Sequence, residues 1–475
     1  MHKSIILIFL FSFLTVKSFC QGTDIFDNSR VHIIKLTSLN QTDWTTIVNR
    51  YASKEYTPLS VEIDGRVLDS VGVRIKGNQF SQQVGAQDKY QQFRLKFGKF
   101  KEGQKYDGLK DVNLHMSEIL KNYAGYDICR NFGLVAPRTS FAKLYFDNVY
   151  IGIYLIVDEA DKVFLKRNYD DDKGNLYKAD DKGAYLNDTV VSAAYKLETN
   201  TTVNDKSDLA RLLKAIHNTP DNVVVDSISK YLNLSTFLKF LAVEMYINKR
   251  DAFYDSGHNY FLYHNADNRF EYFTWDLDYA FNTLDPYSIS FRSQNGPMTH
   301  KFIIKILTVP ALRNMYFSTV CDLLNSSASN KVRLLGLVNN TENFLISNSL
   351  SFSDSRSEFT LPRMRDYITN RYDAISAELS AGGHCRISSN ENSIDRGVSL
   401  AIFPNPVNDV LTLSSNNSNI LLVELSDLAG RKILQQKWID ASENFLSLSD
   451  QKPGMYIIKF VNKDGTEVYE RVIKQ

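Results

Sequence analysis

The stretch NKRDAFYDSGHNYFLYHNADNRFEYFTWDLDYAFN, residues 248–282, decides how the central part of the chain folds. Asn259–Tyr263 and Phe270–Trp275 predict two strands, because both are rich in aromatic residues and a short polar turn separates them. Antiparallel pairing places the start of the first strand beside the end of the second. We therefore expect Asn259 and Asp276 to be neighbours at one end of this hairpin.

Asp251 lies on the polar loop that leads to the same end of the hairpin. Two or three carboxylates with an amide oxygen form a hard, oxygen-rich site, which suits Mg²⁺ or Mn²⁺ rather than zinc. A loop Asp, an Asn, a hairpin and a second Asp are typical of a phosphoryl-transfer site, where a carboxylate orients the incoming hydroxyl and metal ions hold the phosphates. Asp and Asn are also common in turns and caps, so this spacing alone leaves a purely structural interpretation open.

The residues before this stretch alternate in the manner of a sheet and then give way to helical patterns. Two hairpins are predicted, at Asp64-Gly65 and at Asp147-Asn148, each between runs of alternating apolar residues. A helix is expected after Ser117, ending at Asn131 before Gly133, and a largely buried helix after Ser235. The order predicts an α+β fold with a strand-rich first part and a helix-rich second part.

The composition excludes several classes of protein. Of 475 residues, 43% are hydrophobic and 23% charged, which is ordinary for a globular protein and excludes wholesale disorder. Lys+Arg 55 against Asp+Glu 54 leaves a net charge of +1, which argues against nucleic acid as a partner. The four Cys show no CxxC spacing, so we expect neither a zinc ribbon nor a disulfide scaffold.

The first residues, MHKSIILIFLFSFLTVKSFCQ, have the layout of a secretory signal. Lys3 precedes an apolar run, and small residues stand shortly before Gln21, which predicts a signal peptide over residues 1–20 and export to the periplasm. An uncleaved anchor is the alternative, although the run is short for a bilayer span. No later stretch is long and apolar enough to suggest a transmembrane segment in the mature chain.

The other end of the chain predicts a small separate domain. Residues 381–400 are rich in Gly, Ser and Asn and read as a linker, and short alternating strands over 401–475 predict a β-sandwich. The phrases IFPNPVNDVLTL, VELSDLAGRKIL and PGMYIIKF resemble the type A sorting domain of type IX secretion cargo in Bacteroidetes. The resemblance implies a secreted or outer-membrane surface protein whose partner is the type IX machinery. The alternative is an ordinary carbohydrate-binding or adhesive β-domain.

Several central motifs, in order, resemble the CotH kinase family, which is named for a spore-coat protein. They are VGVRIKGN (Val71–Asn78), FRLKF (Phe93–Phe97), GIYLIVDEADKVFL (Gly152–Leu165), GNLYK (Gly174–Lys178), YKLETN (Tyr195–Asn200), HNYFLY and WDLDYAF. The resemblance spans most of residues 24–380. It implies an atypical protein-kinase-like domain of two parts that uses ATP with Mg²⁺ or Mn²⁺.

Carried over by position, the resemblance makes Asp251 the candidate catalytic base and makes Asn259 and Asp276 metal ligands, with Asp278 as a second ligand or a support. It further makes Arg74, Lys76 and Arg94 candidates for binding the ATP phosphates, although the two arginines have the alternative of pairing with surface acids. The family's acidic partner of such a cation is usually Glu, whereas this chain has Asp158 followed by Glu159, which leaves the choice between them open.

The function that the resemblance implies is an exported atypical Ser/Thr protein kinase that phosphorylates surface or extracellular proteins. Two alternatives of other classes stay open. One is a non-catalytic surface or adhesion protein that uses the fold as a binding module. The other is a hydrolase in which Asp251 and Asp276 form a carboxylate pair acting on a glycan.

Overall fold

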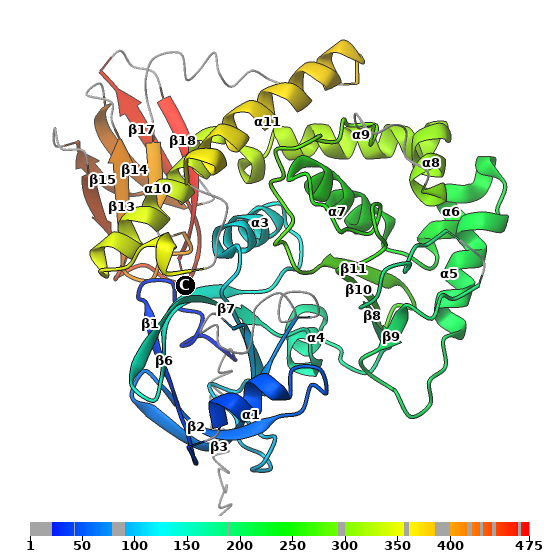
Figure 1. The fold of residues 1–475 in the computed structure, drawn as a ribbon. Coiled ribbons are helices and arrows are strands. Elements are labelled where there is room, and N and C mark those ends of the chain that lie inside the picture. Colours follow the sequence, from blue (N-terminus) through cyan, green and yellow to red (C-terminus); the bar gives the residue numbers. More distant parts are fainter. Residues whose placement is uncertain are drawn as a thin grey trace, which may run out of the picture. The chain divides into compact units, whose positions relative to one another are not determined.

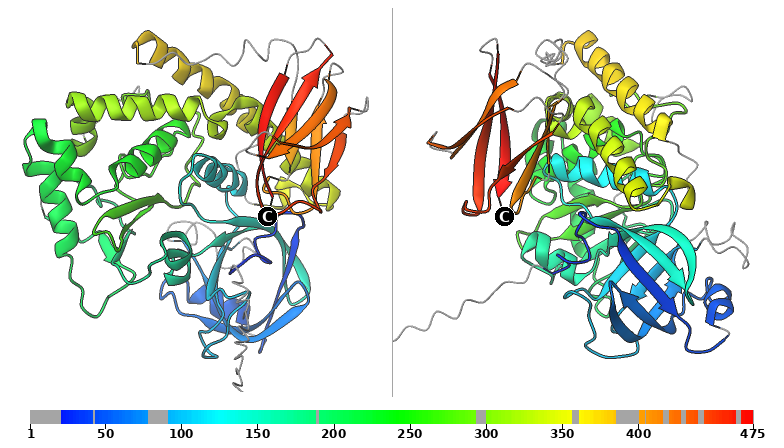
Figure 2. Two further views of the ribbon diagram at one scale, coloured as in Figure 1. Left: turned by 180° about the vertical axis from the view of Figure 1, so that it is seen from behind. Right: turned by 90° about the vertical axis from the view of Figure 1, so that its left-hand side faces the viewer.

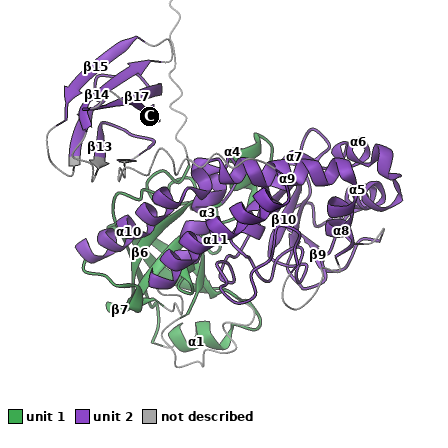
Figure 3. Ribbon diagram, turned by 90° about the horizontal axis from the view of Figure 1, so that it is seen from above, with its two compact units in different colours: residues 1–119, 137–172, 348–358 green, residues 120–136, 173–347, 359–475 purple. Residues whose placement is uncertain are grey.

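The computed structural model contains helices and strands in two compact units (Figure 1, Figure 3). The first unit comprises residues 1–119, 137–172 and 348–358, and the second comprises 120–136, 173–347 and 359–475. The structure describes residues 21–41, 43–77, 91–187, 190–292, 300–355, 361–384, 400–403, 405–415, 420–427, 431–438, 443–463 and 467–474. The predicted signal peptide, Asn78 and most of the predicted linker lie outside these residues.

The first unit is built on a closed barrel, whose strands are drawn in blue to cyan in Figure 2. The strand order is β1-β2-β3-β4-β5-β7-β6. Neighbouring strands pair antiparallel, except that β1 and β6 run parallel and close the barrel. Alternate residues point inward, as in β2, where every second side chain is buried. The strands are β1 (His32–Thr37), β2 (Thr57–Ile63), β3 (Arg66–Ile75), β4 (Phe93–Lys96), β5 (Asp111–His115), β6 (Thr139–Phe146) and β7 (Val149–Asp158).

Both hairpins predicted in this part are confirmed. Asp64 and Gly65 have φ of 49° and 84°, and Asp147 and Asn148 have φ of 47° and 64°. Left-handed backbone at both central residues fits the twist of the flanking strands. The helices of this unit, α1 (Asp43–Asn49) and α4 (Lys162–Tyr169), are short.

The second unit contains a four-stranded sheet of order β11-β10-β8-β9 and most of the helices. The predicted hairpin is confirmed, since β10 pairs antiparallel with β11 and Tyr260 stands opposite Thr274. The strands are β8 (Leu176–Ala179), β9 (Tyr195–Leu197), β10 (Tyr260–His264) and β11 (Phe270–Thr274). The helices are α3 (Ile119–Asn131), α5 (Ser207–Asn218), α6 (Val224–Ser229), α7 (Leu234–Tyr246), α8 (Lys301–Thr308), α9 (Pro310–Leu324), α10 (Lys331–Ser347) and α11 (Leu361–Ala381).

Helix α7 is buried on most sides, as its composition predicts, and packs against α9 and β11. Its start differs from the prediction. The cap is Asn233 rather than Ser235, because the Asn233 side chain accepts a hydrogen bond from the Thr236 N–H. The same amide donates to Glu271 of β11, so tertiary contacts favour the earlier cap. Helix α3 ends at Asn131 as predicted, before Gly133 with φ of 74°.

Residues 400–474 contain two further sheets, of orders β12-β13-β16 and β15-β14-β17-β18. Their buried side chains form one hydrophobic cluster that includes Leu413, Val423, Leu446 and Phe460, which is the packing of a two-sheet domain. The strands are β12 (Leu400–Phe403), β13 (Val410–Ser415), β14 (Ile420–Asp427), β15 (Lys432–Lys437), β16 (Glu443–Ser447), β17 (Gly454–Asn462) and β18 (Glu467–Lys474). Within the described residues, no helix has the length and apolar character required to cross a membrane.

Candidate functional site

The candidate base, Asp251, lies in the second unit on the loop between α7 and β10. Its Oδ1 accepts a short hydrogen bond from the Ser256 hydroxyl. Its Oδ2 is 3.0 Å from His258 Nδ1 and accepts a hydrogen bond of 3.1 Å from Asn259 Nδ2. The structure thus joins the predicted base to the predicted metal ligand Asn259 directly.

The charge state of Asp251 follows from these contacts. Burial raises the pKa of its carboxyl, but hydrogen bonds from His258 and Ser256, with the charges of His258 and Lys182, outweigh burial and lower the pKa to about 2. Burial has the opposite effect on His258 and lowers the pKa of its imidazole. The hydrogen bond to Asp251 and the charge of Asp251, together with the Asp180 carbonyl and the charge of Asp276, outweigh burial and raise this pKa overall. His258 therefore supports an ionised Asp251.

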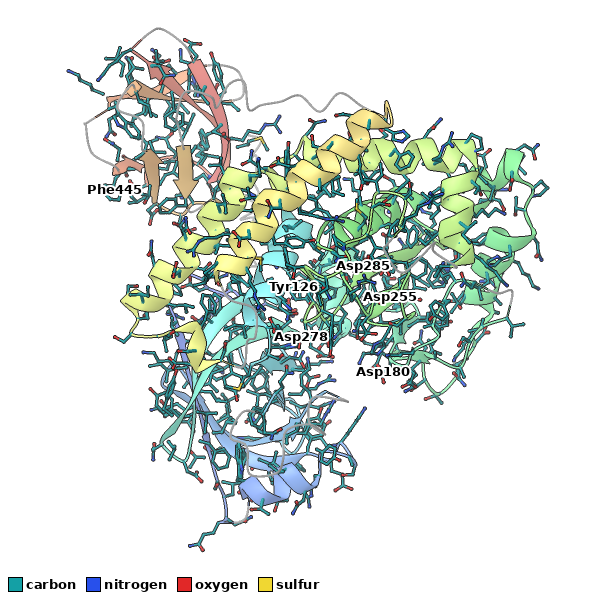
Figure 4. All side chains as sticks on the ribbon, turned by 45° about the horizontal axis from the view of Figure 1, so that its top comes forward. Tyr126, Asp180, Asp255, Asp278, Asp285 and Phe445 are labelled. Atoms are coloured by element: carbon teal, nitrogen blue, oxygen red, sulfur yellow. The ribbon has the colours of Figure 1, made fainter. Side chains whose placement is uncertain are left out.

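The carboxylate of Asp255 stabilises the loop around Asp251 by accepting hydrogen bonds. The Asp251 N–H donates to Asp255 Oδ2 over 2.9 Å, and the Tyr287 hydroxyl donates to Asp255 Oδ1 over 3.2 Å. Arg250 donates to the Tyr287 hydroxyl and to the Asp285 carbonyl, at 2.8 and 2.6 Å. Asp255 therefore orders the turn that carries Asp251. Figure 4 labels Asp255 and Asp285.

Asn259 and Asp276 flank the paired ends of β10 and β11. The Trp275 N–H donates to the Asn259 carbonyl over 3.0 Å, so Asp276 follows a residue that is bonded to Asn259. Within the described residues, no donor contacts Asn259 Oδ1 or Asp276 Oδ2, and a weak 3.4 Å bond from the Asp278 N–H reaches Asp276 Oδ1. Both side chains are partly exposed. They present oxygen atoms that are available to a ligand.

All three of these residues have a left-handed backbone. Their φ values are 56° for Asp251, 57° for Asn259 and 53° for Asp276. Asp and Asn adopt this conformation more readily than most residues, and the same backbone occurs at hairpin turns of this chain such as Asp64 and Asp147.

Helix α3 enforces the conformation of the segment that follows β11. The Asp276 N–H donates to the Tyr126 hydroxyl over 3.1 Å, and the Leu277 N–H donates to Asn122 Oδ1 over 3.0 Å. Both α3 side chains are fully buried, and they lie four residues apart on one helix face. Gly125 lies between them, and a Cβ there would stand 2.5 Å from Leu277 Cδ1. The glycine permits the close approach of helix and segment.

Asp278 is also held by α3. Its Oδ1 accepts a 2.6 Å hydrogen bond from Asn122 Nδ2, and its backbone carbonyl accepts a bond of 3.0 Å from Lys121 Nζ. Figure 4 labels Asp278 and Tyr126. These contacts favour the support role of the two roles predicted for Asp278.

Asn259 and Asp276 present the carboxylate and amide oxygen atoms that Mg²⁺ and Mn²⁺ prefer as ligands. Among the described residues, no group of three His, Cys, Asp or Glu side chains converges in a way that could hold a metal ion. Mg²⁺ is usually bound through one or two carboxylates together with substrate phosphates and water, rather than by a cage of protein ligands. One carboxylate and one amide oxygen match that mode and do not match a structural zinc or calcium site.

The predicted phosphate-binding cations lie in the first unit, on β3, β4 and the residues after β3. Arg74 stacks on the Tyr56 ring at 5.3 Å and donates to the Ile75 carbonyl. Lys76 Nζ contacts Nε2 of His115, a fully buried imidazole whose pKa is lowered well below its usual value by burial and by Lys76. Arg94 stands opposite Arg74 across the strand pair. Two positive charges opposite each other on paired strands are destabilising unless anions lie close to them.

Asp158 and Glu159 serve different cations. Glu159 lies 3.2 Å from Arg94 NH1, and Asp111 lies 3.0 Å from Arg94 NH2. Burial lowers the pKa of the Arg94 guanidinium, but these two carboxylates raise it overall. The buried Asp158 instead pairs with two other arginines, Arg138 and Arg167. Of the two candidate acids, Glu159 is the one that contacts a predicted phosphate-binding cation.

Sequence reasoning missed the α3 residues Asn122 and Tyr126, and it missed Lys249, which contacts the Asn259 carbonyl. Asn122 stands beside Lys121 in a helix that also contains Asp127 and Arg130, so no signal in the sequence distinguishes this buried amide from an exposed one. Lys249 lies next to Arg250 and Asp251 in a polar loop, and nothing in the pattern distinguishes a buried lysine from an exposed one.

Comparison with known proteins places these observations in a family. Residues 401–475 match the secretion system C-terminal sorting domain, which implies type IX secretion and a secreted or outer-membrane surface location. Inner spore coat protein H of Bacillus subtilis (strain 168) is 22% identical over 192 residues, which cover 38% of this chain and 52% of that relative. Residues 73–375, more than half of the chain, match the family described as CotH kinase protein. The chain therefore belongs to the CotH kinase protein family.

Proposed function

We propose that the protein is an exported phosphotransferase that moves the γ-phosphoryl group of ATP to Ser or Thr hydroxyls of surface or secreted proteins. The observation that carries this proposal is the contact of Asp251 with Asn259, beside the available carboxylate oxygen of Asp276. A base, an amide ligand and a metal-binding carboxylate in one segment are what phosphoryl transfer requires. The family and the sorting domain support the kinase class and the export of the chain.

The contacts of Asp251 support the chemistry that we assign to it. Its Oδ1 already accepts a hydrogen bond from a serine hydroxyl, that of Ser256, so an acceptor hydroxyl can bind there in its place. In the transfer, the acceptor oxygen bonds to the γ-phosphorus, the bond from that phosphorus to the bridging oxygen breaks, and ADP leaves. The proton of the hydroxyl passes to Asp251 and then to solvent. His258 orients the carboxylate through its Nδ1.

Asn259 and Asp276 would hold Mg²⁺ or Mn²⁺, which neutralises charge on the phosphates when it is bound. In the first unit we assign Arg74, Lys76 and Arg94 to the phosphates, with Glu159 as the acidic partner of Arg94. An ion pair between a phosphate-binding cation and an acid is a recurring part of protein kinases.

Label transfer from ATP tests the proposal. The full secreted chain is incubated with γ-labelled ATP, Mg²⁺ or Mn²⁺ and a general protein acceptor, and compared with Asp251→Asn and Asp276→Asn. Asp267→Asn is the matched control, because Asp267 is an exposed carboxylate at the far end of the same hairpin. We expect transfer in the wild type and the control, and a loss of at least about 100-fold in the two variants.

Equal transfer by all four proteins would contradict the assignment of Asp251 and Asp276. Nucleotide binding without transfer by the wild type would favour the second candidate, a non-catalytic surface protein that keeps the fold as a binding module. Absence of nucleotide binding would remove the kinase class altogether.

A further inference from the structure

A buried ion pair lies next to the candidate site in the second unit. The side chain of Lys249 is 0% exposed and that of Glu244 is 1% exposed, and Lys249 Nζ lies 3.3 Å from Glu244 Oε1. Removing two charges from water costs several kcal/mol for each ion, and apolar residues of similar size are often as stable or more so. Stability alone therefore gives little reason for a Lys and a Glu at these positions.

The contacts of Lys249 use its whole hydrogen-bonding capacity. An ammonium group has three donors, and the structure supplies three acceptors: Glu244 Oε1 at 3.3 Å, the Asn259 carbonyl at 2.8 Å and Thr274 Oγ1 at 2.7 Å. The Tyr272 hydroxyl in turn donates its one proton to the Glu244 carboxylate and lies 3.0 Å from Oε1 and 3.2 Å from Oε2. Each of the three donors of the Lys249 ammonium therefore has a protein acceptor.

Two of these acceptors belong to the strand ends that carry the proposed metal ligands. Asn259 immediately precedes β10, and Thr274 is the last residue of β11, two positions before Asp276. The Asn259 carbonyl accepts a second bond, from the Trp275 N–H, so Lys249 strengthens the point at which the two strands join. One ammonium group thus fixes both strand ends.

We propose that Lys249 is a positioning residue that sets the spacing between Asn259 and Asp276. The consequence for nucleotide binding rests on the proposed function, whereas the effect on the two strand ends does not. Replacing a residue that hydrogen-bonds to a metal ligand typically weakens metal affinity by 10- to 100-fold. Lys249 acts on Asn259 in this way, through its backbone carbonyl rather than its side chain.

A pair of variants separates positioning from simple stability. Lys249→Met alone leaves the Glu244 carboxylate buried without its cation and risks unfolding the protein. The double variant Glu244→Gln with Lys249→Met removes both charges and leaves Tyr272 a carbonyl oxygen to contact. Glu244→Gln alone keeps the Lys249 bonds to Asn259 and Thr274 but leaves the ammonium buried without its counter-charge, so circular dichroism checks that it is folded and the wild type serves as a second control.

Two measurements on these full-length proteins test the proposal. Hydrogen exchange of the Trp275 amide reports on the strand ends, and calorimetric titration with Mn²⁺ and a non-hydrolysable ATP analogue reports on the site. We expect the double variant to exchange this amide roughly 10-fold faster than Glu244→Gln and to bind the nucleotide at least about 10-fold more weakly, while both remain folded.

Equal exchange of the Trp275 amide in the two variants overturns the positioning role, whatever the protein binds. Faster exchange with unchanged nucleotide affinity also overturns it, because the strand ends would then be held without consequence for the site. If the wild type binds no nucleotide, the proposed function fails, and the exchange data alone decide whether Lys249 fixes the strand ends.

Discussion

The side chains of Asn122 and Asp278 are joined by a 2.6 Å hydrogen bond across 156 positions of the sequence. Asn122 also accepts the Leu277 N–H, so this buried amide uses both of its ends on the segment that follows β11. An amide removed from this place leaves a buried backbone donor without a partner, which costs more than the hydrogen bond itself.

We therefore expect Asn122→Ala to lower the free energy of unfolding by about 2–3 kcal/mol, and to weaken Mn²⁺–nucleotide binding through the displaced segment. Asn131→Ala in the same helix is the control, because Asn131 is exposed and its side chain, among the described residues, bonds to Asp127 alone; its effect should stay within about 0.5 kcal/mol. Urea denaturation measures both. Equal losses in the two variants would show that Asn122 has no special part in holding the segment.

Gly125 and Gly336 form a pair of helical glycines with opposite surroundings. A Cβ at Gly125 would meet Leu277 Cδ1 at 2.5 Å, whereas nothing lies within 4 Å of a Cβ at Gly336 in α10. Gly125→Ala should destabilise the protein by about 1–2 kcal/mol, because Leu277 must move. Gly336→Ala should stabilise it by about 0.5–1 kcal/mol, because alanine restricts the unfolded chain. Thermal unfolding measures both changes. Shifts of the melting temperature with the same sign in the two variants would contradict the proposed close contact.

His300 predicts a dependence of stability on pH. Its Nδ1 accepts the Ile303 N–H and caps α8, its Nε2 is buried without a hydrogen-bond partner among the described residues, and burial lowers its pKa to about 3. The unfolded state binds a proton near pH 6.5, so between these values it binds more protons than the folded state. The free energy of unfolding should therefore decrease as the pH is lowered below 6.5. This histidine contributes at most about 1.4 kcal/mol per pH unit to the decrease.

His300→Asn keeps a side chain that can cap the helix and removes the titration. Urea denaturation at pH 7, 6 and 5 should then give a shallower decline for the variant than for the wild type. Parallel declines would mean that the buried imidazole does not control stability in this range.

Glu159 and Asp158 are adjacent acids with separate tasks. Glu159→Gln should weaken nucleotide binding, because it alters the charge that faces Arg94, and should cost only about 1 kcal/mol of stability, since Asp111 still pairs with that arginine. Asp158→Asn should cost about 3–5 kcal/mol, because it leaves Arg138 and Arg167 without their buried anion. Titration with the nucleotide measures the affinity of each variant, and urea denaturation measures its free energy of unfolding. The reverse order of effects would exchange the two assignments.

The local elements of this fold were largely predictable, because each depends on a short pattern. Asp64-Gly65 and Asp147-Asn148 specify left-handed turns, and the β10–β11 hairpin follows from two apolar runs about a polar turn. The closed barrel was not predictable, because its closure depends on the parallel pairing of β1 with β6, which are more than a hundred residues apart. No local pattern encodes such a pairing.

The candidate site shows the same division. Asp251 and Asn259 lie eight residues apart, and their contact follows from loop and strand order. Tyr126 and Asn122 reach Asp276 and Leu277 from a helix about 150 residues earlier, so only the tertiary fold brings them together. The helix expected after Ser235 is instead capped by Asn233, and the reason is related, since the contact of Asn233 with Glu271 is also remote in sequence.

The left-handed backbone at Asp251, Asn259 and Asp276 has an evolutionary consequence. Glycine would relax the main chain at each position, at the cost of the oxygen atom that the position presents. Laboratory evolution for thermal robustness alone should therefore drift toward glycine here, whereas a screen that rewards turnover should retain the acids and the amide.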